Sequence, residues 1–111
     1  MSEPMSGSEW ISAAEFHRAP GVSDWRVTGN GPHTVFTATS LSHAADLIAP
    51  VVAAAERYGI LPDVDVRPEG VVVRIPNRGP EGIPAAAAEF AAAVSQAAAE
   101  LRLTTASGPA C

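Results

Sequence analysis

The chain has 111 residues with 12 acidic and seven basic side chains, which gives a net charge of −5, and every basic residue is an arginine. This length fits one domain, and an apolar fraction of 47% is enough for a hydrophobic core, which excludes wholesale disorder. A chain with this charge cannot build a large basic face, so we expect no nucleic-acid partner. The single cysteine, Cys111, excludes a disulfide within the chain and a four-cysteine zinc site.

The sequence also predicts where the protein resides. No run approaches the roughly 18–20 consecutive apolar residues that a membrane span needs. The first ten residues include acidic side chains and no basic ones, unlike the start of a secretory signal peptide. We therefore expect a soluble, cytoplasmic protein with no membrane partner.

The N-terminal region predicts a short helix after a tail. Residues 1–8 are mainly Ser, Gly, Pro and Met, and we expect them to be disordered. Ser8 is a candidate N-cap for a helix that ends near Arg18, because the Pro20-Gly21 pair stops a helix.

Two hairpins are predicted from the strand-like segments. Residues 25–28 and 33–39 are rich in β-branched and aromatic side chains and flank a Gly-Asn-Gly-Pro turn. Further on, Val64 and Val66 alternate with charged residues, and the aliphatic run from Val71 to Ile75 follows a Pro-Glu-Gly turn. Each pair of segments predicts two antiparallel strands.

Two longer helices are predicted from apolar residues three and four positions apart. The first begins after Ser40, its N-cap, and ends at Gly59. Pro50 lies inside this range and should kink the helix or remove one hydrogen bond. The second is rich in alanine and runs from Pro84 to about Leu103.

Together these elements predict an α+β fold in the order α-β-β-α-β-β-α. We expect a single four-stranded antiparallel sheet with both long helices packed on one face. This domain covers residues 9–103, and residues 104–111 form a second disordered tail. A small sheet leaves exposed edges that are often paired between subunits, so we expect a homodimer or a tetramer.

Three stretches of the sequence form a pattern: Trp25 opens a strand, Glu56 to Asp63 end a helix, and Gly82-Ile83-Pro84 precede the last helix. In these residues and in the order of its elements, the chain resembles the pterin-4a-carbinolamine dehydratases over about residues 9–103. The corresponding family stretches are a Trp, Glu-x-x-x-His-His-Pro-Asp/Glu and Gly-Leu-Thr. The resemblance implies the fold of that family.

The resemblance also shows which family residues are replaced. The acid–base histidines of the family correspond to Ile60, Leu61 and Arg78, and an Asp of the last helix corresponds to Ala87. Ile and Leu have no titratable proton, and Arg stays protonated at any useful pH, so these residues cannot replace histidine as general acid and base. We therefore expect no dehydration of the pterin carbinolamine above a low background.

Glu56 and Arg78 are the candidate catalytic residues. If Glu56 faces a cleft beside Ile60 and Leu61, burial would raise the pKa of its carboxyl and make it a usable acid or base. A solvated Glu56 paired with Arg57 fits the sequence equally well. Arg78 could hold a carboxylate, a phosphate or an enolate oxygen, or it could be a solvated loop residue.

Five residues are the candidate substrate-binding residues: Ile60, Leu61, Tyr58, Asp63 and His43. Ile60 and Leu61 would make a cavity wall apolar, although packing at a helix end explains them too. Tyr58 fits a core position, and Asp63 with Asp65 fits the solvent face of a strand. The three histidines lack metal-ligand spacing, so we expect no metal and no other cofactor.

Three functions fit this sequence. The first is an enzyme that kept the fold and changed the reaction to a dehydration, cyclisation or isomerisation of a small apolar molecule. The second is a non-catalytic dimeric binding or assembly factor, a role that the resemblance implies because relatives of the fold serve in it. The third is a residual 4a-hydroxytetrahydrobiopterin dehydratase. A cavity of about 300–1,000 Å³ at Glu56 and Arg78 would favour the first.

Overall fold

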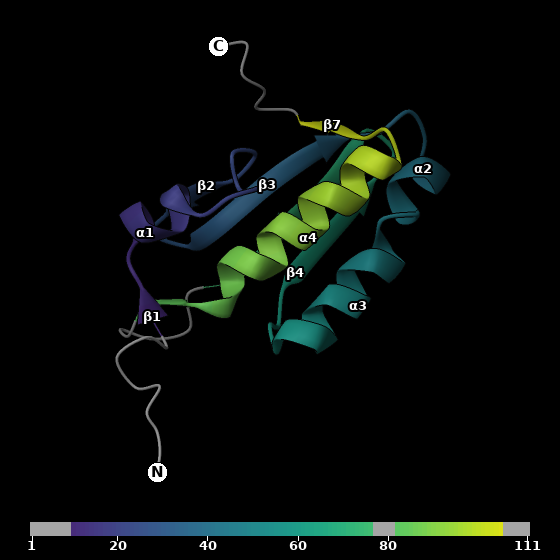
Figure 1. The fold of residues 1–111 in the computed structure, drawn as a ribbon. Helices are drawn as coiled ribbons and strands as arrows, with labels where there is room; N and C mark the ends of the chain where they lie inside the picture. Colours follow the sequence, from purple (N-terminus) through teal and green to yellow (C-terminus); the bar gives the residue numbers. More distant parts are fainter. Residues whose placement is uncertain (1–9, 77–81, 106–111) are drawn as a thin grey trace.

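A computed structural model describes residues 10–76 and 82–105. It confirms an α+β fold in which two long helices lie side by side across one face of an antiparallel sheet (Figure 1). The elements in chain order are β1 (Trp10–Ile11), α1 (Ala13–Arg18), β2 (Arg26–Thr28), β3 (Gly31–Thr37), α2 (Leu41–Ala45), α3 (Ile48–Tyr58), β4 (Asp63–Arg67), β5 (Gly70–Arg74), β6 (Ile83–Pro84), α4 (Ala86–Glu100) and β7 (Thr104–Thr105).

The prediction of a single four-stranded sheet is wrong, because the main sheet has five strands. Four follow the order β2-β3-β5-β4, and β7 pairs with β3, where Thr104 lies opposite Thr37. The Oγ1 of Thr37 donates to the carbonyl of Thr104 at 3.1 Å. The first two residues of the expected 104–111 tail therefore belong to the sheet. A separate two-stranded sheet joins β1 to β6.

The start of the chain also differs from the prediction. Ser12 is the N-cap of α1, whereas Ser8 lies outside the described residues. The Ser12 hydroxyl accepts from the Glu15 N–H at 3.1 Å, and the Glu15 carboxylate accepts from the Ser12 N–H at 2.8 Å. This reciprocal capping box fixes the start of the helix, and Trp10 and Ile11 are left to pair with β6.

The single helix predicted between Ser40 and Gly59 is in fact two helices, α2 and α3. Ser40 caps α2 as predicted, and its hydroxyl accepts from the His43 N–H at 3.1 Å. Pro50 is the third residue of α3, where a backbone N–H has no acceptor within its own helix. Within α3 proline therefore costs no hydrogen bond, but it cannot donate to the carbonyl of Asp46 one turn earlier, and there the predicted helix is interrupted.

One hydrophobic core lies between the sheet and its helical layer. Phe36 of β3 and Val71 and Val73 of β5 are fully buried there against Phe90 of α4. The Trp25 ring packs edge-on against Phe90, with ring centroids 6.4 Å apart, and its Nε1–H donates to the Ser95 hydroxyl at 2.9 Å. Because the buried residues alternate along β3 and β5, the opposite face of the sheet carries none of this core.

The C-terminus of α4 is a Schellman motif formed without glycine. The Leu103 N–H donates to the Ala98 carbonyl at 2.9 Å, and the Arg102 N–H donates to the Ala99 carbonyl at 3.0 Å. Arg102 has a φ of 64°, in the left-handed region that glycine adopts most readily. Leu103 is buried beside the helix end, and the turn directs the chain into β7.

We expect Arg102→Gly to stabilise the protein by about 0.5–1 kcal/mol, because glycine adopts this φ without steric strain. Arg102→Ala is the matched control, since it removes the same side chain and keeps the strain. Urea unfolding of both variants measures the difference. An Arg102→Gly protein less stable than Arg102→Ala would contradict this account of the helix end.

Candidate functional site

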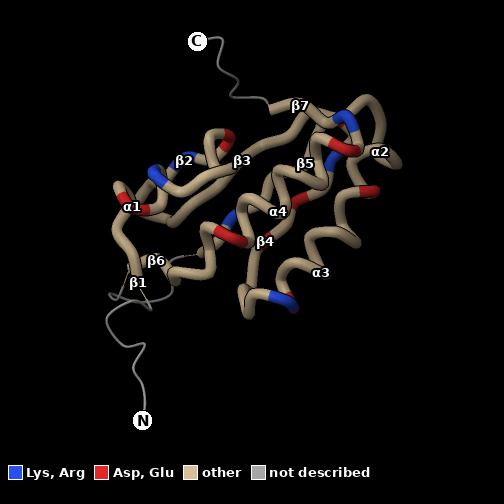
Figure 2. Tube along the Cα trace, in the orientation of Figure 1, with Lys and Arg blue, Asp and Glu red and all other residues tan. Residues whose placement is uncertain are grey.

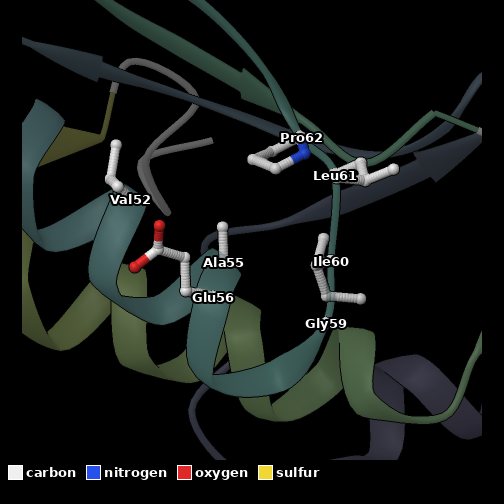
Figure 3. Close-up of a pocket in the computed structure, with 7 residues that line it drawn as sticks. All are labelled: Val52, Ala55, Glu56, Gly59, Ile60, Leu61 and Pro62. Carbon is white, nitrogen blue, oxygen red and sulfur yellow. The ribbon is translucent and has the colours of Figure 1, made fainter.

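A groove of about 460 Å³ lies where α3 ends and the chain crosses to β4 (Figure 3). Three of its residues come from α3, and the others come from the connection between the two elements. Among these residues Glu56 alone is ionisable, so the groove is an apolar surface with one carboxyl group. The lining residues are Val52, Ala55, Glu56, Gly59, Ile60, Leu61 and Pro62.

The geometry of the groove depends on how α3 terminates. Gly59 has a φ of 68°, and both its N–H and the N–H of Ile60 donate to the Ala55 carbonyl, the latter at 3.0 Å. This left-handed turn drives Ile60 into the core, where it is 4% exposed, and leaves Leu61 71% exposed. Ile60 therefore forms the floor of the groove and Leu61 its rim.

The α3 side of the groove follows from helical spacing. Val52, Ala55, Glu56 and Gly59 are three and four residues apart, which places them on one face of the helix. Figure 3 shows the side chains of Val52 and Ala55 rising from α3 on the side of Pro62, whereas the Glu56 carboxylate extends toward Val52. Sequence reasoning missed Val52 and Ala55, although their spacing from Glu56 is the signal that could have found them.

Of the two environments that the sequence left open for Glu56, the structure has the solvated one. Its side chain is exposed, so its apolar neighbours do not desolvate it. Within the described residues it forms no ion pair, and Arg57 lies instead over the Tyr58 ring, 5.3 Å from the centroid. Glu56 is thus a solvated carboxyl group at the mouth of the groove, available to a bound molecule.

Arg78, the second candidate catalytic residue, lies outside the described residues. Its approach to Glu56 therefore stays a prediction.

Tyr58 and Asp63 do not line the groove. Tyr58 is half-buried against the hydrophobic core and lines a separate hollow of about 210 Å³ with Pro50 of α3 and Ala93 of α4. Asp63 is exposed at the start of β4 and lies opposite Arg74 in the sheet. Of the residues predicted to bind substrate, Ile60 and Leu61 are thus the pair that the structure brings together with Glu56.

His43 also lies outside the groove, and both of its ring nitrogens are occupied. The Thr39 N–H donates to Nδ1 at 3.1 Å, so Nδ1 is the acceptor. Nε2 then carries the hydrogen and donates to the Leu101 carbonyl at 2.7 Å. This bond joins α2 to the C-terminal end of α4 and satisfies a helix-end carbonyl, which is a structural role.

The charged residues are distributed over both layers of the fold (Figure 2). On α3 the charges are Glu56 and Arg57, close to the groove, whereas most of α4 is uncharged. In residues 10–76 and 82–105, no three His, Cys, Asp or Glu side chains come together in a way that could hold a metal ion. None of the helices in the same ranges has the length and apolar character needed to cross a membrane.

No protein-family model matches this sequence, and no curated protein sequence matches it either. The resemblance to the pterin-4a-carbinolamine dehydratases therefore stays a prediction based on the motif residues and the element order.

We expect His43→Ala to destabilise the protein by about 1–2 kcal/mol, because it leaves a helix-end carbonyl and a backbone N–H without their partners. Ser42→Ala, an exposed neighbour on α2, is the control and should change stability by less than about 0.5 kcal/mol. Thermal and urea unfolding measure both effects. Equal stability of the two variants would show that the His43 bonds contribute nothing.

Proposed function

We propose that this protein is a small-molecule enzyme with a fold like that of the pterin-4a-carbinolamine dehydratases, acting on an apolar substrate in the α3 groove. The observation that carries the proposal is the groove itself. Its volume of about 460 Å³ falls within the roughly 300–1,000 Å³ of small-molecule sites. It also forms at Ile60 and Leu61, where the resemblance places two catalytic histidines of the family.

The lining favours chemistry that uses a carboxylate in place of histidine. A carboxylate can remove a proton from one atom of a substrate and return it to another, which an isomerisation or a cyclisation requires. A bound apolar molecule resting on Ile60 and Leu61 would displace water from the mouth and strengthen its contacts with Glu56. In this proposal Arg78 holds a developing negative charge on the substrate, and no cofactor takes part.

The binding part of the proposal is tested with indole as an apolar probe and methyl NMR as the readout. We expect indole to shift the methyl signals of Val52, Ile60 and Leu61. Leu61→Asp should weaken indole binding at least about fivefold, because it places a charge on the apolar rim. Leu41→Asp is the matched control, since Leu41 is also exposed but lies on α2 away from the groove.

The catalytic part is tested on any compound that the protein converts. Glu56→Gln should lower the rate at least about tenfold, or about 1.4 kcal/mol, with the fold intact. Glu89→Gln, on α4, is the matched control and should have no effect. If Glu56→Gln and Arg78→Ala both leave the rate unchanged, the site lies elsewhere.

The same assay separates the third function. Ile60 and Leu61 cannot act as acid or base, so we expect little dehydration of the pterin carbinolamine. A dehydration rate within about tenfold of an ordinary family rate would contradict this expectation and favour a residual dehydratase.

The second function, a non-catalytic dimeric factor, is favoured by the free edge of β4. Within the described residues, β4 pairs with β5 on one side only. Antiparallel pairing of two copies about Asp65 would set Asp63 opposite Arg67 of the other copy and Val64 opposite its Val66. Each Asp65 would face its counterpart, and Arg67 offsets this repulsion because it already binds Asp65 at 2.8 Å.

We expect light scattering at micromolar concentration to give at least twice the mass of one chain. Asp63→Lys should dissociate the assembly, because it sets a cation opposite Arg67, whereas Glu89→Lys makes the same charge change on the exposed side of α4 and should not. A monomeric protein, or an assembly unaffected by Asp63→Lys, would exclude this pairing.

A further inference from the structure

The sheet face opposite the helices carries a row of basic side chains across three strands. The register sets Arg26 of β2 opposite His33 of β3, and His33 opposite Arg74 of β5. Register partners project from the same face of a sheet. His33 alternates with buried Pro32 and Thr34, so this row lies on the face away from the hydrophobic core.

The positive charges of Arg26 and Arg74 are not neutralised by ion pairs within the described residues. Within the described residues neither Arg26 nor Arg74 forms an ion pair or a side-chain hydrogen bond. Asp63 is the next member of the row, directly opposite Arg74, but it forms no salt bridge there. Two guanidinium groups that flank His33 on the same sheet face and have no ion-pair partner among the described residues favour an anion between them.

Two valines form a small apolar surface beside the basic row. Val35 of β3 and Val72 of β5 are register partners two residues from His33 and Arg74, on the same face, and both are half-buried. Two residues along a strand span about 7 Å. The face therefore has a row of basic side chains and, two residues along the strands, an apolar surface.

We propose that Arg26, His33 and Arg74 form a binding site for a small organic anion, a carboxylate or a phosphate monoester. Its acid group lies between the two arginines, and its apolar part rests on Val35 and Val72. Arginine suits this role because its planar group binds carboxylate or phosphate through two parallel hydrogen bonds.

The dimensions and charge of the molecule fit such a site. Arg26 and Arg74 are separated by one strand, so their backbones lie about 10 Å apart and the long side chains can converge over His33. The net charge of −5 gives the protein no long-range attraction for anions, so binding must come from these local contacts. The site is separate from the α3 groove and does not depend on its proposed function.

Backbone NMR titration with phenyl phosphate and with benzoate tests the proposal and separates the two acid groups. We expect saturable shifts at Arg26, His33 and Arg74, extending to Val35 and Val72, with a dissociation constant below about 10 mM for at least one probe. Inorganic phosphate and acetate, which lack the apolar part, should bind at least about threefold more weakly than their aromatic counterparts.

Three single arginine variants and one double variant then assign the contacts. Arg26→Gln and Arg74→Gln should each weaken binding at least about fivefold, and the double variant should abolish it. Arg67→Gln is the control, since Arg67 projects from the same face but is paired with Asp65, and it should leave the affinity within about twofold. Unchanged thermal unfolding establishes that each variant is folded.

Three results would overturn the proposal: no saturable binding, equal loss in all three single variants, or shifts centred on Ile60 and Leu61 of the groove.

Discussion

Burial of a single sheet face under α4 is the contact on which the rest of this molecule depends. Phe36, Val71 and Val73 present an unbroken apolar surface, and burying each such side chain contributes about 1.5–3 kcal/mol. The small alanines of α4 let the helix lie close to that surface while Phe90 fills the gap. Because α3 and α4 lie on this face, the opposite face carries none of the core, and the β4 edge has no strand partner within the described residues.

The groove results from the way in which α3 ends and connects to β4. α3 packs against α4 and must then reach β4 at the sheet edge, so the chain turns sharply at Gly59. That turn anchors Ile60 in the core and holds Leu61 and Pro62 outside it. A helix end that fixes one apolar residue and exposes the next creates an apolar hollow, and Glu56 stands at its mouth one turn earlier.

The sequence predicted the β4–β5 hairpin because Val64 and Val66 alternate with charged residues and the β5 segment is continuously aliphatic, and both segments are strands of the sheet. The sequence could not reveal β7, because two threonines are too short a segment to show the alternation of a strand. They pair with β3 because the end of α4 places them beside it. Pro50 indicated a disturbance of the predicted helix, but the sequence did not show whether the helix would kink at the proline or divide one turn before it. Ile60 and Leu61 were placed at the site by the motif, but the exposure of Glu56 depends on tertiary packing.

The claim that the end of α3 is a small-molecule site is tested most directly by a crystal structure of the protein with a bound apolar bicyclic compound such as indole. The account predicts electron density for the compound within van der Waals contact of Ile60 and Leu61, with its polar atom directed at the Glu56 carboxylate. Well-ordered indole bound elsewhere, with the groove empty at saturating concentration, would contradict it.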